Sequence, residues 1–159
     1  MLDCYRVALE ATKDLLDERF ARAVELIAGL DSILIVTGLG KSGLVAQKVA
    51  ATMSSTGTQA VFVHPVEALH GDLGVVRPGS ALLALSKSGG NEETIAFARQ
   101  FKVVTGGQVV SLTEPDSKLA AIADIALEIP ALPEIDRRVR SRPWPFAMCW
   151  RSSCSRPRA

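Results

Sequence analysis

The sequence predicts an α/β fold, a doubly wound, flavodoxin-like sheet of five parallel strands with helices on both faces. Two observations predict this fold. Short apolar runs rich in Val, Ile and Leu alternate with segments of helical period, which is typical of a parallel sheet covered on both sides. Two of these runs also stop at small, hydrogen-bonding residues, in the loops over residues 38–43 (GLGKSG) and 86–91 (SKSGGN).

The first predicted element is an amphipathic N-terminal helix over residues 8–30. Apolar side chains recur there at helical spacing, and Gly29 stands near the end. The later elements alternate, with strands predicted over residues 32–36, 60–63, 81–85, 108–112 and 125–129, and helices over residues 42–55, 66–70, 92–104 and 117–123.

Length and composition predict one soluble domain. The chain has 159 residues, of which 48% are hydrophobic, and no apolar run approaches the roughly 20 residues that span a bilayer. The N-terminus lacks the basic cluster and apolar core of a secretory signal, so we expect a cytoplasmic protein without membrane contact. The cysteines Cys4, Cys149 and Cys154 show no metal-ligand spacing, and reduced thiols are expected.

The charge distribution divides the chain near Glu134. Residues 1–134 hold 11 Lys and Arg against 16 Asp and Glu, whereas residues 135–159 hold seven Arg against Asp136 alone. No helical or strand period survives in this Arg-rich tail, which we expect to be irregular. A basic arm for nucleic acid is one interpretation, and an off-frame coding end is another.

The residue pattern over 38–43 is typical of a phosphate-binding turn. A Walker A loop is excluded because it needs glycine five residues before the Gly-Lys pair, and that position is Ile35. The three glycines fit the dinucleotide pattern G-x-G-x-x-G, but the next strand runs into His64 and Pro65 instead of an acidic residue. Dinucleotide binding therefore stays a minor alternative, beside a turn in which Gly43 serves only close packing.

The loop over residues 86–91 supplies a second set of anion ligands. The hydroxyls of Ser86 and Ser88 and the backbone N–H groups of Gly89 and Gly90 can converge on one anion ahead of a helix. Local capping of the turn by serine is the alternative. Because the carboxyl ends of parallel strands meet at one edge of the sheet, both loops can face a single pocket. The two loops together indicate a phosphorylated small molecule.

Several motifs resemble the sugar isomerase (SIS) domain of the arabinose 5-phosphate isomerases. They are residues 38–43, 55–58 (STGT), 62–65 (FVHP), 70–74 (HGDLG) and 86–89 (SKSG). The resemblance runs from the N-terminal helix to Glu134, so an SIS domain is expected over residues 1–134. It implies interconversion of D-arabinose 5-phosphate and D-ribulose 5-phosphate, a step toward lipopolysaccharide. Members usually carry a pair of CBS modules after this domain, and the sequence shows none.

The resemblance also implies roles for single residues. Lys41 would stabilise the negative charge of an enediolate, and Glu93 would be the base that moves the proton. His70 and Glu134 match further catalytic positions, and His64 matches a position that can bind a divalent metal such as zinc, although one histidine is no metal site by itself. No cofactor is required. The implied substrate- and phosphate-binding residues are Gly40, Ser42, Gly57, Thr58, His70, Ser86, Ser88, Gly89, Gly90 and Asn91.

The sequence departs from the family at Lys87, where a neutral amide is usual, and at Gly90, where an acidic residue is usual. After Glu134 the family's final apolar helix and a downstream catalytic histidine have no counterpart. Read one frame over, residues 143–159 can encode an apolar segment that resembles that helix, so we hypothesise a frameshift and expect no nucleic-acid partner. Sequencing the coding DNA tests this hypothesis.

Two functions therefore stay open. One is a sugar-phosphate isomerase, inactive if the altered C-terminus has removed essential groups. The other is a non-catalytic, regulatory module that senses a phosphosugar. Since SIS domains associate through helices, a homo-oligomer, either a dimer or a tetramer, is expected in both cases.

Overall fold

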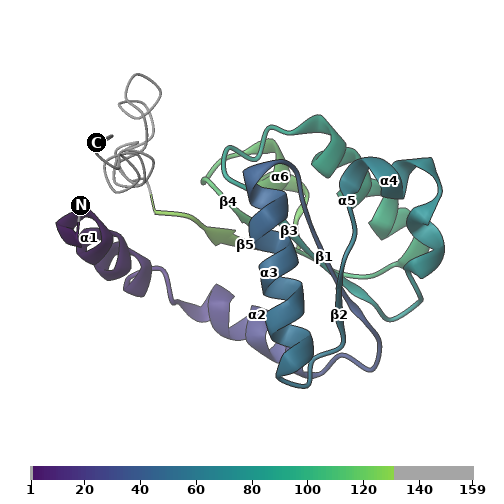
Figure 1. The fold of residues 1–159 in the computed structure, drawn as a ribbon, viewed down its shortest axis with the longest axis horizontal. Coiled ribbons are helices and arrows are strands. Elements are labelled where there is room, and N and C mark those ends of the chain that lie inside the picture. Colours follow the sequence, from purple (N-terminus) through teal and green to yellow (C-terminus); the bar gives the residue numbers. More distant parts are fainter. Residues whose placement is uncertain (1, 131–159) are drawn as a thin grey trace, which may run out of the picture.

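A computed structural model of the chain describes residues 2–130, and its centre is a five-stranded, all-parallel sheet (Figure 1). The strand order β2-β1-β3-β4-β5 is the flavodoxin-like order, so the predicted fold class is confirmed. No helix in this part of the chain is long and apolar enough to cross a membrane. The strands are β1 (Leu34–Gly38), β2 (Ala60–Phe62), β3 (Ala81–Ser86), β4 (Val109–Thr113) and β5 (Ile125–Glu128).

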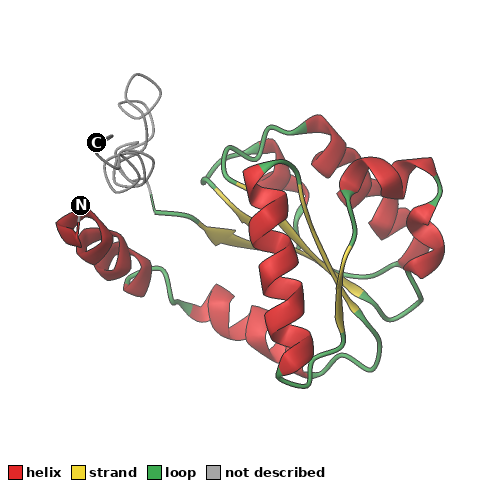
Figure 2. Cartoon of the chain, in the orientation of Figure 1, coloured by secondary structure: helices red, strands yellow, loops and turns green. Residues whose placement is uncertain are grey.

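Helices cover both faces of the sheet (Figure 2). Alternate residues of a strand point to opposite faces, and β1 shows this directly. Leu34 belongs to a buried cluster with Ala46, whereas Ile35 belongs to a second cluster with Phe97. The first cluster lies under α2 (Glu18–Ala28) and α3 (Lys41–Ser55), and the second lies under α4 (Pro65–His70), α5 (Glu92–Thr105) and α6 (Lys118–Ile122).

The N-terminal segment differs from its prediction, because two helices replace the single helix expected over residues 8–30. α1 (Leu2–Lys13) ends before Asp14, and α2 begins after Asp17. The carboxylate of Asp17 accepts hydrogen bonds from the backbone N–H groups of Arg19 (2.9 Å) and Phe20 (3.3 Å), which is an N-cap that starts a new helix. α1 consequently projects away from the sheet (Figure 1).

The other predicted elements are all present with their ends shifted by at most two residues. The largest shift is in β1, which continues to Gly38 because its last residues pair with β3, Thr37 with Ala84 and Gly38 with Leu85. One element was not predicted, the short 3-10 helix η1 (Asp72–Val75) that follows α4.

Candidate functional site

An open cleft of about 780 Å³ lies at the carboxyl edge of the sheet. The loop after β1 forms one side and the loop after β3 forms the other, as predicted from the strand ends. The residues that line it are Leu39, Gly40, Lys41, Ser42, Leu85, Ser86, Lys87, Ser88, Asn91 and Glu114.

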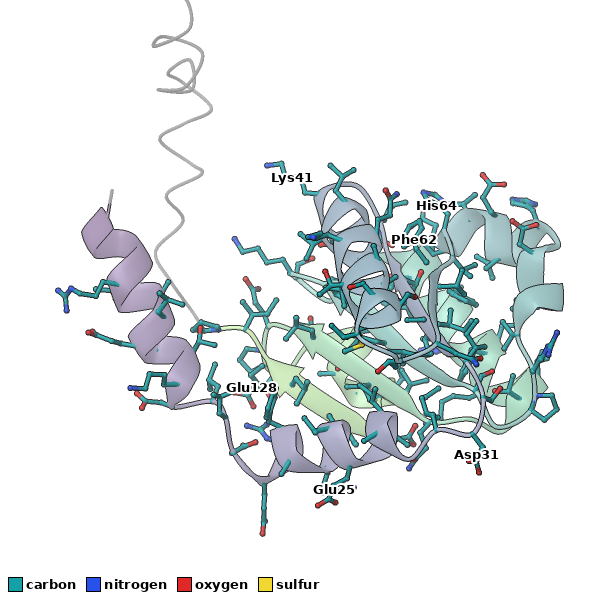
Figure 3. The ribbon with its side chains drawn as sticks, turned by 60° about the horizontal axis from the view of Figure 1, so that its bottom comes forward. Glu25, Asp31, Lys41, Phe62, His64 and Glu128 are labelled. Atoms are coloured by element: carbon teal, nitrogen blue, oxygen red, sulfur yellow. The ribbon has the colours of Figure 1, made fainter. Side chains whose placement is uncertain are left out.

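The loop after β1 brings the start of α3 to the cleft. Gly40 is the N-cap residue, with φ of +59°, and no side chain caps the helix there. Close packing fixes the loop, because a Cβ on Gly43 would lie 2.7 Å from the carbonyl oxygen of Gly38. The packing role of Gly43 is therefore real, and it places Lys41 and Ser42 on the cleft wall. Figure 3 shows Lys41 at this edge of the sheet.

The loop after β3 packs against the loop after β4 and is hydrogen-bonded to the helix that follows it. Gly89 has φ of +58°, and a Cβ there would lie 2.1 Å from Oγ of Ser117 and 2.4 Å from Oγ1 of Thr113. The carbonyl of Gly89 accepts a hydrogen bond from the N–H of Leu119 (3.0 Å). Only glycine fits this position, since a side chain would clash and the φ value is unfavourable for other residues.

Glu114, directly after β4, joins the cleft although the sequence analysis did not single it out. Its backbone N–H donates to the carbonyl of Lys87 (2.8 Å), and its half-buried side chain lines the cleft. The hydroxyl of Thr113 also donates to the carbonyl of Lys87 (3.4 Å). Ligands of parallel sheets bind at the carboxyl ends of the strands. The end of the fourth strand is such a position, so the same rule predicts Glu114.

Asn91 has a structural role as well as a place in the cleft. Its Oδ1 accepts hydrogen bonds from the N–H (3.0 Å) and the hydroxyl (2.7 Å) of Thr94, so it caps α5. The next residue, Glu92, accepts a hydrogen bond from Nζ of Lys118 (2.6 Å), and this contact lowers the pKa of the Glu92 carboxyl below its usual value. The first contact fixes the start of α5 directly after the serine loop, and the second ties that start to α6.

The cleft unites six of the predicted site residues from two separate loops, and Gly89 and Gly90 shape the second loop without lining the cleft. Glu93, the predicted base, lies on the first turn of α5 with an exposed side chain and does not line the cleft. Glu134 lies outside the described residues. The six residues are Gly40, Lys41, Ser42, Ser86, Ser88 and Asn91.

The two histidines lie on α4 and its N-cap, outside the cleft lining. The ring of His64 packs edge-on against Phe62, with ring centroids 6.4 Å apart (Figure 3). Its Nδ1 is buried, with no hydrogen-bond partner in the described part of the chain. Among residues 2–130 no three His, Cys, Asp or Glu side chains gather where they could hold a metal ion together. As a metal ligand, His64 stays a prediction.

Gly57 and Thr58 lie at the opposite, amino edge of the sheet. They line a separate cavity of about 200 Å³ with Asp31 and Ser32, which precede β1. Figure 3 shows Lys41 and Asp31 at opposite ends of the domain. The chain therefore does not bring Gly57 and Thr58 to the cleft, and their contact with the substrate stays a prediction.

The fold and the cleft define a doubly wound α/β domain with two loops at one sheet edge that carry the candidate anion ligands. The sequence pattern of the SIS domain matches residues 31–151, past the boundary that the sequence analysis put near residue 134. The chain belongs to the SIS domain family.

Named relatives and a solved structure agree with this family. The arabinose 5-phosphate isomerase KdsD of Pseudomonas aeruginosa is 39% identical over 124 residues, and GutQ of Escherichia coli K12 is 38% identical over 122 residues. These alignments cover 77% and 74% of the chain but 38% of each relative. The E. coli CFT073 protein c3406, solved in complex with arabinose 5-phosphate, is 35% identical with a TM-score of 0.70, and the match covers 80% of this chain and 69% of c3406.

Proposed function

We propose that the chain binds a pentose phosphate in the carboxyl-edge cleft and acts as an aldose–ketose isomerase on D-arabinose 5-phosphate and D-ribulose 5-phosphate. The observation that carries the proposal is the meeting of the glycine loop and the serine loop in one cleft. The identity to KdsD and GutQ and the c3406 complex with arabinose 5-phosphate support the substrate class.

The residues in the cleft suit the binding half of this reaction. The hydroxyls of Ser86 and Ser88 and the N–H groups at the start of α5 would hold the phosphate. Lys41 would then face the carbonyl end of the sugar and stabilise the oxyanion that develops on it.

The proton transfer needs no external oxidant or reductant. A base removes the proton from C2 of the aldose, an enediolate forms, and the proton is returned to C1 while the hydroxyl proton passes from O2 to O1. Glu93, two residues beyond the cleft residue Asn91, is our candidate base, with His70 and Glu134 as the further catalytic groups that the family resemblance implies.

Turnover of ribulose 5-phosphate tests the enzymatic part of the proposal. We expect activity from a version with the reading frame restored after Glu134, and a loss of about 100-fold or more in Glu93→Gln. Glu25→Gln is the matched control, because Glu25 is an exposed glutamate on α2, far from the cleft (Figure 3). If the restored protein is inactive and Glu93→Gln is indistinguishable from it, the catalytic assignment fails.

A regulatory, non-catalytic phosphosugar sensor is the second candidate. The exposed position of Glu93 outside the cleft lining favours it, since binding alone needs no base. Tight binding of the sugar phosphate without turnover in the restored protein would select this function.

We also expect the protein to work as a homo-oligomer in the cytoplasm. The exposed apolar side chains on the helices, among them Phe20 on α2 and Leu44 on α3, support association. The separation of Gly57 and Thr58 from the cleft supports a site that a second copy completes.

A further inference from the structure

Glu114 brings a carboxylate to the wall of the carboxyl-edge cleft. It is the only carboxylate residue among the described residues that line the cleft. Its side chain is half-buried and has no hydrogen-bond or ion-pair partner within residues 2–130. A partly buried carboxylate needs hydrogen-bond donors from another source. In an open cleft, water supplies these donors until a ligand takes its place.

The backbone of Glu114 is held beside the serine loop. Its N–H donates to the carbonyl of Lys87 (2.8 Å). The preceding residue, Thr113, pairs with Ser86 in the sheet, and Pro115 follows. The carboxylate therefore extends from a fixed point on the cleft wall, next to the loop that we propose as the phosphate site.

A sugar phosphate brings hydroxyl donors as well as a phosphate, and these donors need acceptors in the site. A carboxylate accepts hydrogen bonds without donating any, whereas a lysine ammonium only donates them. The side-chain oxygen of Asn91 already accepts two hydrogen bonds from Thr94, and the hydroxyls of Ser86 and Ser88 are the proposed phosphate ligands. Glu114 is therefore the strongest acceptor left in the described lining for the hydroxyls of a sugar.

The charge of Glu114 also affects how a ligand lies in the cleft. A carboxylate disfavours a phosphate placed against it, because like charges repel. The phosphate end of a ligand is consequently expected at the serine hydroxyls and the start of α5, and the polyhydroxylated end at Glu114.

We infer that Glu114 is a specificity-determining residue that accepts hydrogen bonds from the hydroxyl groups of the sugar. It selects a polyhydroxylated phosphate ester over one with a bare alkyl chain. The inference rests on the proposed phosphosugar site and names the residue in that site that recognises the sugar part of the ligand.

Calorimetric titration of the full chain with two non-reacting compounds tests the inference. D-arabinitol 5-phosphate carries the open-chain hydroxyls of the sugar, and n-pentyl phosphate has the same carbon chain without them. The measured quantity is the ratio of the first affinity to the second, because any contact with the shared phosphate cancels in it. Glu114→Gln removes the charge at nearly unchanged size. Asp116→Asn is the matched control, because Asp116 is exposed, does not line the cleft and has a positive φ that Asn tolerates.

We expect the parent chain to bind arabinitol 5-phosphate at least about tenfold more tightly than pentyl phosphate. Glu114→Gln should bind arabinitol 5-phosphate about tenfold more weakly. It should bind pentyl phosphate as tightly as the parent or more tightly, because a repelling charge has been removed. These different responses separate recognition from damage to the loop, which would weaken both compounds. Asp116→Asn should leave the ratio unchanged.

Three results would overturn the inference while the proposed function stands. They are equal binding of both compounds by the parent, a preference that Glu114→Gln keeps or that Asp116→Asn also loses, and an equal weakening of both compounds in Glu114→Gln. If neither compound binds the parent chain, the inference and the proposed function both fail.

Discussion

Gly89 determines the shape of the serine loop more directly than any hydroxyl in it. Its positive φ and the short distances to Ser117 and Thr113 leave no room for a side chain. We predict that Gly89→Ala lowers the free energy of unfolding by about 1–3 kcal/mol and weakens sugar-phosphate binding at least tenfold. Gly90→Ala is the control, because a Cβ there would meet nothing closer than 3.9 Å. Urea unfolding and calorimetry measure both effects, and equal behaviour of the two variants would contradict this account.

Asp124 is one residue whose charge makes the stability of the fold depend on pH. Burial raises the pKa of its carboxyl, but hydrogen bonds from Lys102 (2.7 Å) and the N–H of Val109 (2.8 Å) outweigh burial and lower this pKa below its usual value. A lowered pKa in the folded state adds stability above the unfolded value, and this stability is lost as pH falls through the folded value.

We therefore predict that Asp124→Asn is less stable than the parent at neutral pH by about 1–2 kcal/mol. The difference should shrink as the pH falls through the lowered pKa of the Asp124 carboxyl. Urea unfolding over a pH series measures it, with Asp31→Asn, at an exposed position, as the control. A difference that stays constant down to acidic pH would show that the carboxylate charge is not the cause.

At the scale of elements, the start of α5 contributes both to the stability of the fold and to the cleft. Its N-cap residue, Asn91, also lines the cleft. We predict that Asn91→Ala lowers the free energy of unfolding by about 1 kcal/mol, since the cap is lost. Asn91→Asp keeps the cap but puts a negative charge beside the bound phosphate. It should unfold like the parent while binding the sugar phosphate at least tenfold more weakly. Parallel unfolding and binding curves separate the two, and an Asp variant that binds as well as the parent would exclude Asn91 from the site.

Most of the helices and strands could be predicted, because each is marked by an apolar run or a helical period within its own residues. The break at residues 14–17 was missed because apolar residues such as Leu15 continue the helical period across it, and only the cap at Asp17 reveals the new start. Glu114 was not predicted because the segment at the end of β4, residues 113–117 (TEPDS), contains no glycine that marks an anion-binding loop. The position of Thr58 before a strand, not after one, already placed it at the amino edge.

At the scale of the whole molecule, the α2 and α3 face of the sheet is the expected contact between copies. Phe20, Val24, Leu44 and Val45 on this face are 41–67% exposed. We predict that light scattering detects a dimer or tetramer, and that the double substitution Val24→Asp and Val45→Asp produces monomers. Val103→Asp, on α5 at the opposite face, is the control. A parent chain that is a stable monomer would contradict the predicted assembly.

Binding of D-arabinose 5-phosphate, measured by calorimetry, tests the central claim that the two loops form a phosphosugar site. We predict saturable binding of the phosphate ester and no detectable binding of unphosphorylated D-arabinose. The double substitution Ser86→Ala and Ser88→Ala should weaken binding at least tenfold, whereas Ser55→Ala at the exposed end of α3 should not. Equal binding of the two sugars, or full affinity without both serine hydroxyls, would contradict the claim.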